Sequence, residues 1–174
     1  MKNFLIFTAT FLFAFSSYGQ EVKTTKEILK AATAKAGKEN KKVFIIFSAS
    51  WCGWCKKMDA SINDTTTKKY FDENYIILYL TVLETPANKM LETPGAFDYM
   101  KSLKADAAGL PFFVILNKNG ELVGDSFVNK QNMGCPAATE EIASFITLLK
   151  KTSTINEIGL DAIAKRFKLN SPQR

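Results

Sequence analysis

The sequence predicts an α/β domain in which helices cover both faces of a central mixed sheet that ends in an antiparallel hairpin. Three observations support this prediction. Helical and strand-like patterns alternate along the chain, short continuous apolar runs are typical of buried strands, and a short Asn-Lys-Asn-Gly turn joins the last two strands. The chain has 174 residues, of which 47% are hydrophobic, enough for one domain with its own core.

In the first half of the chain, the spacing of the apolar residues distinguishes helices from strands. Helical spacing at Ile28, Leu29, Ala32 and Ala36 follows a capping threonine, whereas the strands are unbroken runs of β-branched and aromatic residues. The expected elements are a helix at 24–39, a strand at 42–47 buried on both faces, a turn at 48–51, a helix that begins near Cys52, a short helix at 66–73 and a strand at 75–82.

The second half begins with a loop at 84–95 that contains two prolines and a glycine. The turn at 117–120 makes its two flanking strands an antiparallel hairpin. The expected elements are a helix at 96–104, strands at 111–116 and 121–127, a helix at 139–150 and an amphipathic helix at 155–168.

The N-terminus has the pattern of a secretory signal peptide. Lys2 precedes an uncharged apolar run at 4–15, and the small residues Ser17 and Gly19 suit cleavage after Gly19. The alternative, a transmembrane anchor, needs a longer run of about 20 apolar residues. We therefore expect residues 1–19 to be removed and an exported protein, periplasmic or secreted, that is soluble after cleavage.

The mature chain is expected to be a single domain at 20–174. Its core covers about 24–150, and 155–168 form a C-terminal helical extension that either caps the domain or docks a partner. The net charge of +6 comes from lysines scattered along the chain, a pattern typical of a solvated surface, so no nucleic-acid partner is expected.

The segment Trp51-Cys52-Gly53-Trp54-Cys55 carries the predicted chemistry. It follows a strand and opens a helix, so Cys52 lies where the helix dipole and free N–H groups favour a thiolate. Cys55 lies one turn later on the same face and can attack a mixed disulfide formed at Cys52. The sequence therefore predicts a redox-active cysteine pair, with Trp51, Gly53 and Trp54 shaping the surface around it.

Two other interpretations of the cysteine pair are a zinc site and a purely structural bridge. Structural zinc takes four ligands, but the chain has no histidine and only one Cys-x-x-Cys. A structural bridge over so short a loop stabilises little. We expect neither a metal nor an organic cofactor.

Two segments resemble the thioredoxin superfamily, and in particular its exported bacterial members. The first is Ser-Trp-Cys-Gly-Trp-Cys-Lys-Lys-Met at 50–58, and the second is Gly-Leu-Pro-Phe-Phe at 109–113. The resemblance implies a thioredoxin-like fold over about 24–150. It also implies that Pro111 is cis beside the cysteines and that the backbone of Leu110 pairs with a bound peptide, as an added strand would.

The chain departs from thioredoxin in three ways. Ile46 stands where thioredoxin has a buried aspartate thought to move a proton, and Glu84 is the nearest acidic substitute. Trp54 stands where thioredoxin has proline, so the reduction potential of thioredoxin cannot be transferred. The stretch between the two motifs is longer, and an insert at 84–104 is expected beside the active site.

The expected function is a thiol–disulfide oxidoreductase, with Cys52 as nucleophile and Cys55 as resolving cysteine, that reduces disulfides in exported proteins. A redox partner must recycle the pair, and a membrane-embedded donor would be the natural one. The alternatives are an oxidase or isomerase with the same residues, and a peptide- or protein-binding module with a structural disulfide. Cys135 is either a buried small residue or a second redox cysteine.

Overall fold

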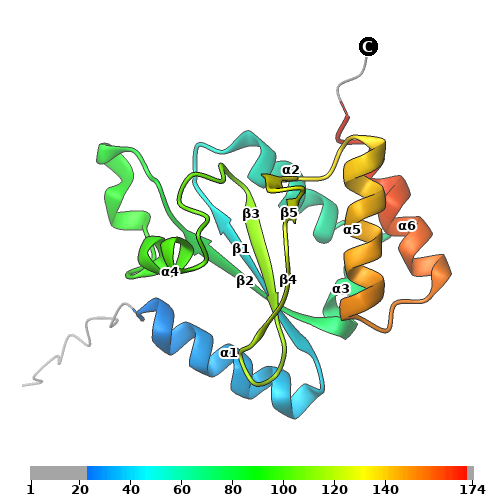
Figure 1. Ribbon diagram of the computed structural model, residues 1–174, viewed down its shortest axis with the longest axis horizontal. Coiled ribbons are helices and arrows are strands. Elements are labelled where there is room, and N and C mark those ends of the chain that lie inside the picture. Colours follow the sequence, from blue (N-terminus) through cyan, green and yellow to red (C-terminus); the bar gives the residue numbers. More distant parts are fainter. Residues whose placement is uncertain (1–22, 172–174) are drawn as a thin grey trace, which may run out of the picture.

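The computed structural model describes residues 23–171 and has a four-stranded sheet between two helical layers (Figure 1). The strands lie in the order β2 (Tyr75–Thr81), β1 (Lys42–Ser48), β3 (Phe112–Leu116) and β4 (Leu122–Asp125). β1 is parallel to β2 and antiparallel to β3, and β3 pairs with β4 as the predicted antiparallel hairpin. The mixed sheet is therefore confirmed.

Helices cover both faces of this sheet, as predicted. One face carries α1 (Thr25–Glu39) and α4 (Ala96–Ser102), and the other carries α2 (Gly53–Ile62), α3 (Lys68–Asn74), α5 (Thr139–Thr152) and α6 (Glu157–Lys168). Figure 1 shows α4 to the left of the sheet, α1 below it, and α5 and α6 to its right.

The central strand β1 explains why two separate cores form. Its side chains alternate between faces, so Phe44 and Ile46 join the core under α2, α5 and α6. Val43, Ile45 and Phe47 join the core under α1 and α4. All five side chains are at most 1% exposed, which confirms the expectation of a strand buried on both faces.

The ends of α1 follow from local sequence. Thr24 caps the helix: its hydroxyl accepts from the N–H of Glu27, and the Glu27 carboxylate accepts from the N–H of Thr24. Asn40 ends it in the left-handed conformation, at φ 52°.

The predicted strand at 121–127 is wrong in one respect, because it breaks at Ser126. The buried Ser126 hydroxyl accepts from the N–H of Phe113 and donates to Asn132. After the break, β5 (Phe127–Val128) and β6 (Gln131–Asn132) form a second small antiparallel sheet. The predicted loop at 84–95 contains a 3₁₀ helix, η1 (Pro86–Leu91).

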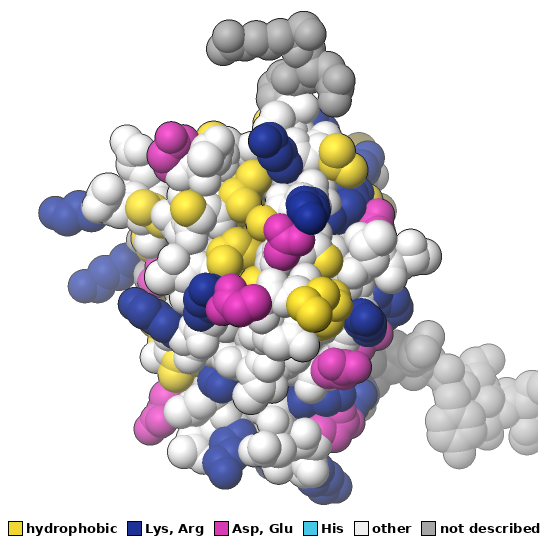
Figure 2. Space-filling view, turned by 90° about the vertical axis from the view of Figure 1, so that its right-hand side faces the viewer, with side chains coloured by type: hydrophobic (Ala, Val, Ile, Leu, Met, Phe, Trp, Pro, Cys, Tyr) yellow, Lys and Arg dark blue, Asp and Glu magenta, His cyan; other side chains and the backbone are white. Residues whose placement is uncertain are grey.

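The C-terminal helix α6 packs against the domain. Leu160, Ile163 and Phe167 lie in the same core as Phe145 of α5. This segment therefore packs on the domain as part of its core. Figure 2 views this side of the molecule, where hydrophobic side chains are interspersed with basic and acidic ones.

The expected signal peptide at 1–19 lies outside the described residues. Within residues 23–171, no helix combines the length and the apolar character needed to cross a bilayer.

Candidate active site

The cysteine pair lies where the turn after β1 enters α2. The backbone N–H of Cys52 donates to Ala49 O at 3.0 Å, which closes the turn and brings Cys52 to the N-cap position of α2. There the Cys52 Sγ accepts a hydrogen bond from the backbone N–H of Cys55 at 3.1 Å. A sulfur that already accepts a helix N–H is well placed to carry negative charge, because the helix dipole adds to that hydrogen bond.

The two cysteines form a disulfide. Cys52 is 4% exposed and Cys55 is 7% exposed, so only a small part of the pair faces solvent. The arrangement can cycle between a disulfide and a dithiol by thiol–disulfide exchange.

The two tryptophans beside the pair are held on the surface. Trp51 is 54% exposed, and its ring N–H donates to Leu83 O at 2.8 Å. Trp54 is 41% exposed, and Lys57 Nζ lies 4.3 Å from the centre of its ring. Both rings therefore offer apolar surface beside the cysteines.

Gly53 lies between the cysteines in the first turn of α2. A Cβ added at Gly53 would meet no heavy atom within 4 Å apart from its chain neighbours and the nearby backbone of α2. The absence of a side chain here is therefore not required by packing within the domain, and it leaves the approach to the cysteines open.

The second motif lies against the first. Leu110 packs on the cluster formed by Ala49, Cys52 and Cys55. The Leu110–Pro111 peptide bond is cis. The structure thus brings together the two segments that the sequence places far apart.

Asn132 holds this loop and was missed by the sequence analysis. Its Nδ2 donates to three backbone oxygens, those of Pro111 at 2.9 Å, Ala108 at 3.0 Å and Gly109 at 3.3 Å. Its Oδ1 accepts from the Ser126 hydroxyl at 2.6 Å and from a backbone N–H at 3.0 Å. No local pattern marks an asparagine after a short hairpin as the anchor of a distant loop.

Glu84 anchors the turn before the cysteines. Its carboxylate accepts from the Ser50 N–H at 2.5 Å and from the Ser50 hydroxyl at 2.7 Å, although Glu84 is only 7% exposed. Ile46 of β1 is 1% exposed in the apolar core, whereas the buried acid of this site, Glu84, lies in the loop that follows β2. Both oxygens of Glu84 are engaged by Ser50.

The predicted insert at 84–104 divides into two parts. Its first part lies against the active-site turn, where Asn88 Nδ2 donates to Ser50 Oγ at 3.4 Å and Glu92 accepts from the N–H of Glu84 at 2.9 Å. Its second part forms α4, which packs on the sheet. These hydrogen bonds to the active-site turn therefore come from the first part of the insert.

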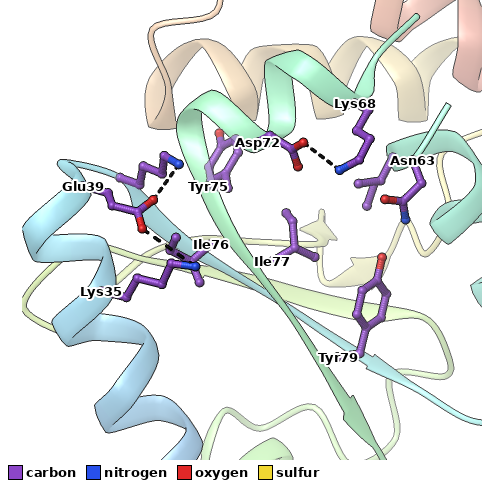
Figure 3. A pocket seen from close by; sticks show the side chains of 11 residues that line it. Lys35, Glu39, Asn63, Lys68, Asp72, Tyr75, Ile76, Ile77 and Tyr79 are labelled. Carbon is purple, nitrogen blue, oxygen red and sulfur yellow. Dashed lines mark hydrogen bonds and ion pairs between the residues drawn. The ribbon is translucent and has the colours of Figure 1, made fainter. Parts of the chain in front are cut away.

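A hollow of about 470 Å³ lies beside the pair and is lined by Cys55, Lys56, Glu84 and Leu91, among others. Another hollow, of about 380 Å³, lies along the edge strand β2 (Figure 3). The charges of that second hollow pair with one another, Glu39 with two lysines and Asp72 with Lys68, so they are not left free for a ligand.

The environment of Cys135 differs from that of the active-site cysteine pair. It is 5% exposed, and Asn170 Nδ2 donates to its Sγ at 3.4 Å. Burial raises the pKa of this thiol to about 12, which keeps it protonated at neutral pH. The interpretation of Cys135 as a buried small residue agrees with this environment.

A solved structure with a TM-score above 0.5 supports the fold. A disulphide isomerase from Xylella fastidiosa is 14% identical over 87% of this chain and 93% of that chain, with a TM-score of 0.52. A thioredoxin from Thermus thermophilus is 18% identical over 70% of this chain and 80% of that chain, with a TM-score of 0.45. The DsbD C-terminal domain of Neisseria meningitidis is 25% identical over 59% and 82% of the two chains, with a TM-score of 0.41.

None of the curated proteins compared with the chain matches it. The profile of the thioredoxin-like domain family matches residues 29–133. This range runs from α1 to the residue after Asn132 and includes both motifs and the loop that Asn132 holds. The chain therefore belongs to the thioredoxin-like domain family.

Proposed function

We propose that this protein is a thiol–disulfide oxidoreductase that reduces disulfides in exported proteins. The observation that carries the proposal is the position of Cys52, at the N-cap of α2 with a backbone N–H on its Sγ and with Cys55 one turn away. A structural disulfide needs no such placement, whereas a nucleophilic thiolate does.

The reaction begins with the reduced pair. The Cys52 thiolate attacks one sulfur of the substrate disulfide, a mixed disulfide forms, and the other substrate sulfur leaves as a thiolate that takes up a proton. Cys55 then loses its proton and attacks Cys52 Sγ. The second substrate thiol is released, and two electrons have passed from the Cys52–Cys55 dithiol to the substrate.

The substrate docks on the surface around the pair. Leu110 contacts the cysteine cluster, and its backbone is proposed to pair with an extended substrate segment beside the cis Pro111. Trp51 and Trp54 supply apolar contact area, and the open space at Gly53 admits the substrate backbone.

The oxidised pair must be reduced again after each turnover, so the cycle requires a redox partner. Export rests on the leader-like sequence at 1–19, and a donor in the membrane is the partner that suits a reductase outside the cytoplasm. The mature protein would then be the single domain at 20–174. Mass determination of the protein from producing cells tests this directly: a chain that begins at Gln20 supports export, and an intact Met1 terminus contradicts it.

The reduction potential of the pair tests the direction. Protein carrying Cys135→Ser is equilibrated in graded thiol–disulfide buffers, and trapped thiols are counted by mass. A potential near about −270 mV supports a reductase, and one near about −120 mV means an oxidase instead. If no thiols form short of denaturation, the disulfide is structural and the protein is a binding module.

Single variants separate the roles of the two cysteines. Cys52→Ser should abolish both mixed-disulfide formation and turnover. Cys55→Ser should still form the mixed disulfide and then stall, because no resolving thiol is present. If both variants turn over substrate, the proposed chemistry is wrong.

A further inference from the structure

A groove of about 690 Å³ lies next to the loop that carries Leu110 and Pro111. Ala107, Ala108 and Phe127 form its apolar part, and Lys104 and Lys130 are its charged side chains. Asn132 also lines the groove, and the same amide holds the backbone of Ala108 and Pro111. A chain bound beside Leu110 can therefore continue into this groove.

Lys104 occupies a backbone position that favours glycine. It follows α4 with φ 58°, and the N–H of Ala105 donates to Met100 O at 3.2 Å, as in a Schellman motif. The left-handed residue of this motif is usually glycine, because a Cβ is disfavoured there.

Lys130 occupies a second such position. Asn129 and Lys130 form the two-residue connection between β5 and β6, with φ of 50° and 66°. Two left-handed residues in a hairpin define a type I′ turn, whose preferred sequence is Asn-Gly. A lysine at the second place is less favourable for the fold than glycine.

Both lysines are free to bind an anion. They are exposed, and the residues that line the groove include no acidic side chain. Among the ion pairs formed within residues 23–171, none involves Lys104 or Lys130. Two lysines thus stand at positions where the backbone favours glycine, and both face one groove beside the substrate loop.

We propose that this groove binds an acidic segment of the substrate protein, next to the disulfide that is reduced. The proposal rests on the oxidoreductase function proposed above and adds its substrate preference. The apolar part receives the aliphatic portions of the segment, and the two ammonium groups pair with its carboxylates. Added salt should weaken the preference, because the pairs are exposed.

The test compares two peptide disulfides that differ only in their flanking residues, glutamate in one and glutamine in the other. Lys104→Gly and Lys130→Gly should each raise KM for the glutamate peptide roughly two- to fivefold, as expected for loss of an exposed ion pair. KM for the glutamine peptide should not change. Thermal stability should stay equal or rise, because glycine relieves the left-handed backbone.

Two control variants show whether an effect on KM comes from the groove itself. They make the same kinds of backbone and charge change elsewhere in the protein. Asn40→Gly makes the same backbone change at the end of α1, where φ is 52°, and Lys38→Gln removes an exposed charge from α1. Neither should change KM for either peptide.

The outcomes distinguish the two proposals. If the wild-type protein reduces both peptides with equal KM, or if the glycine variants affect both peptides alike, the acidic preference is wrong while the oxidoreductase function stands. If neither peptide is reduced, the proposed function itself fails.

Discussion

Replacing Asn132 with alanine should destabilise the protein and weaken substrate binding together. The change removes two N–H donors that serve three backbone oxygens and one oxygen that accepts two hydrogen bonds. A net hydrogen bond contributes about 1 kcal/mol, and a buried donor left unsatisfied costs about 1–3 kcal/mol. The hydroxyl of Ser126, fully buried, loses its acceptor. We expect the free energy of unfolding to fall by about 3 kcal/mol.

Thermal unfolding followed by circular dichroism measures this loss. A change of about 3 kcal/mol lowers Tm by roughly 6–12 °C in a protein of this size class. Asn63→Ala is the matched control, because the Asn63 amide donates only to Asp59 on the exposed surface and should cost less than about 1 kcal/mol. Asn132→Asp keeps the size of the side chain but places a carboxylate against three carbonyl oxygens, so it should be at least as harmful as alanine.

The same variants report on the site. With the loop at 108–111 released, KM for a peptide disulfide should rise, whereas alkylation of Cys52 in the reduced protein should keep its rate. A loss of stability no larger than that of Asn63→Ala would refute the reasoning. An unchanged KM at the predicted loss of stability would show that the loop keeps its shape without Asn132.

Three further changes test other parts of the structure. Glu84→Ala removes two charge-assisted hydrogen bonds from the active-site turn and should lower the free energy of unfolding in urea by about 3 kcal/mol; a loss below about 1 kcal/mol would contradict this role. Burial raises the pKa of Cys135 to about 12, so iodoacetamide at pH 8 should label the reduced active-site pair and spare Cys135 until the protein unfolds, as mass spectrometry will show. Hydrogen bonds from Thr66 and then from Arg166 lower the pKa of Asp64 to about 2. Because that value is below the unfolded one of about 4, the stabilisation by Asp64 is present above pH 4 and is lost as pH falls toward about 2; Asp64→Asn should flatten the fall of stability in this range, and an unchanged acid profile would refute it.

The strands could be predicted from the sequence because burial on both faces leaves a local signature. Residues 43–47 of β1 are uniformly apolar, since one face packs under α1 and the other under α5. The end of the helix at Asn40 and the start of α2 after Cys52 also follow from residues close in sequence.

The elements that the sequence analysis missed depend on contacts between distant residues. The strand predicted at 121–127 has an unbroken pattern, but β4 ends where the hydroxyl of Ser126 bonds to Phe113 and Asn132. Likewise, the 3₁₀ helix η1 is linked to the distant turn at Ser50 by its own Asn88 and by Glu84 just before it. Local propensity carries no information about such pairs.

In this site, local sequence therefore specifies the reactive sulfur, whereas contacts between distant residues specify the surface around it. The sulfur chemistry depends on the first turn of α2, which five consecutive residues specify. The shape of the surface around it depends on two polar side chains, Glu84 and Asn132, that hold the active-site turn and the loop before β3. Substitutions at these anchors should change substrate affinity and stability more than the reactivity of Cys52, because they leave the helix N-terminus intact. Motif matching alone would overlook both residues, although they hold the two segments that meet at the cysteines.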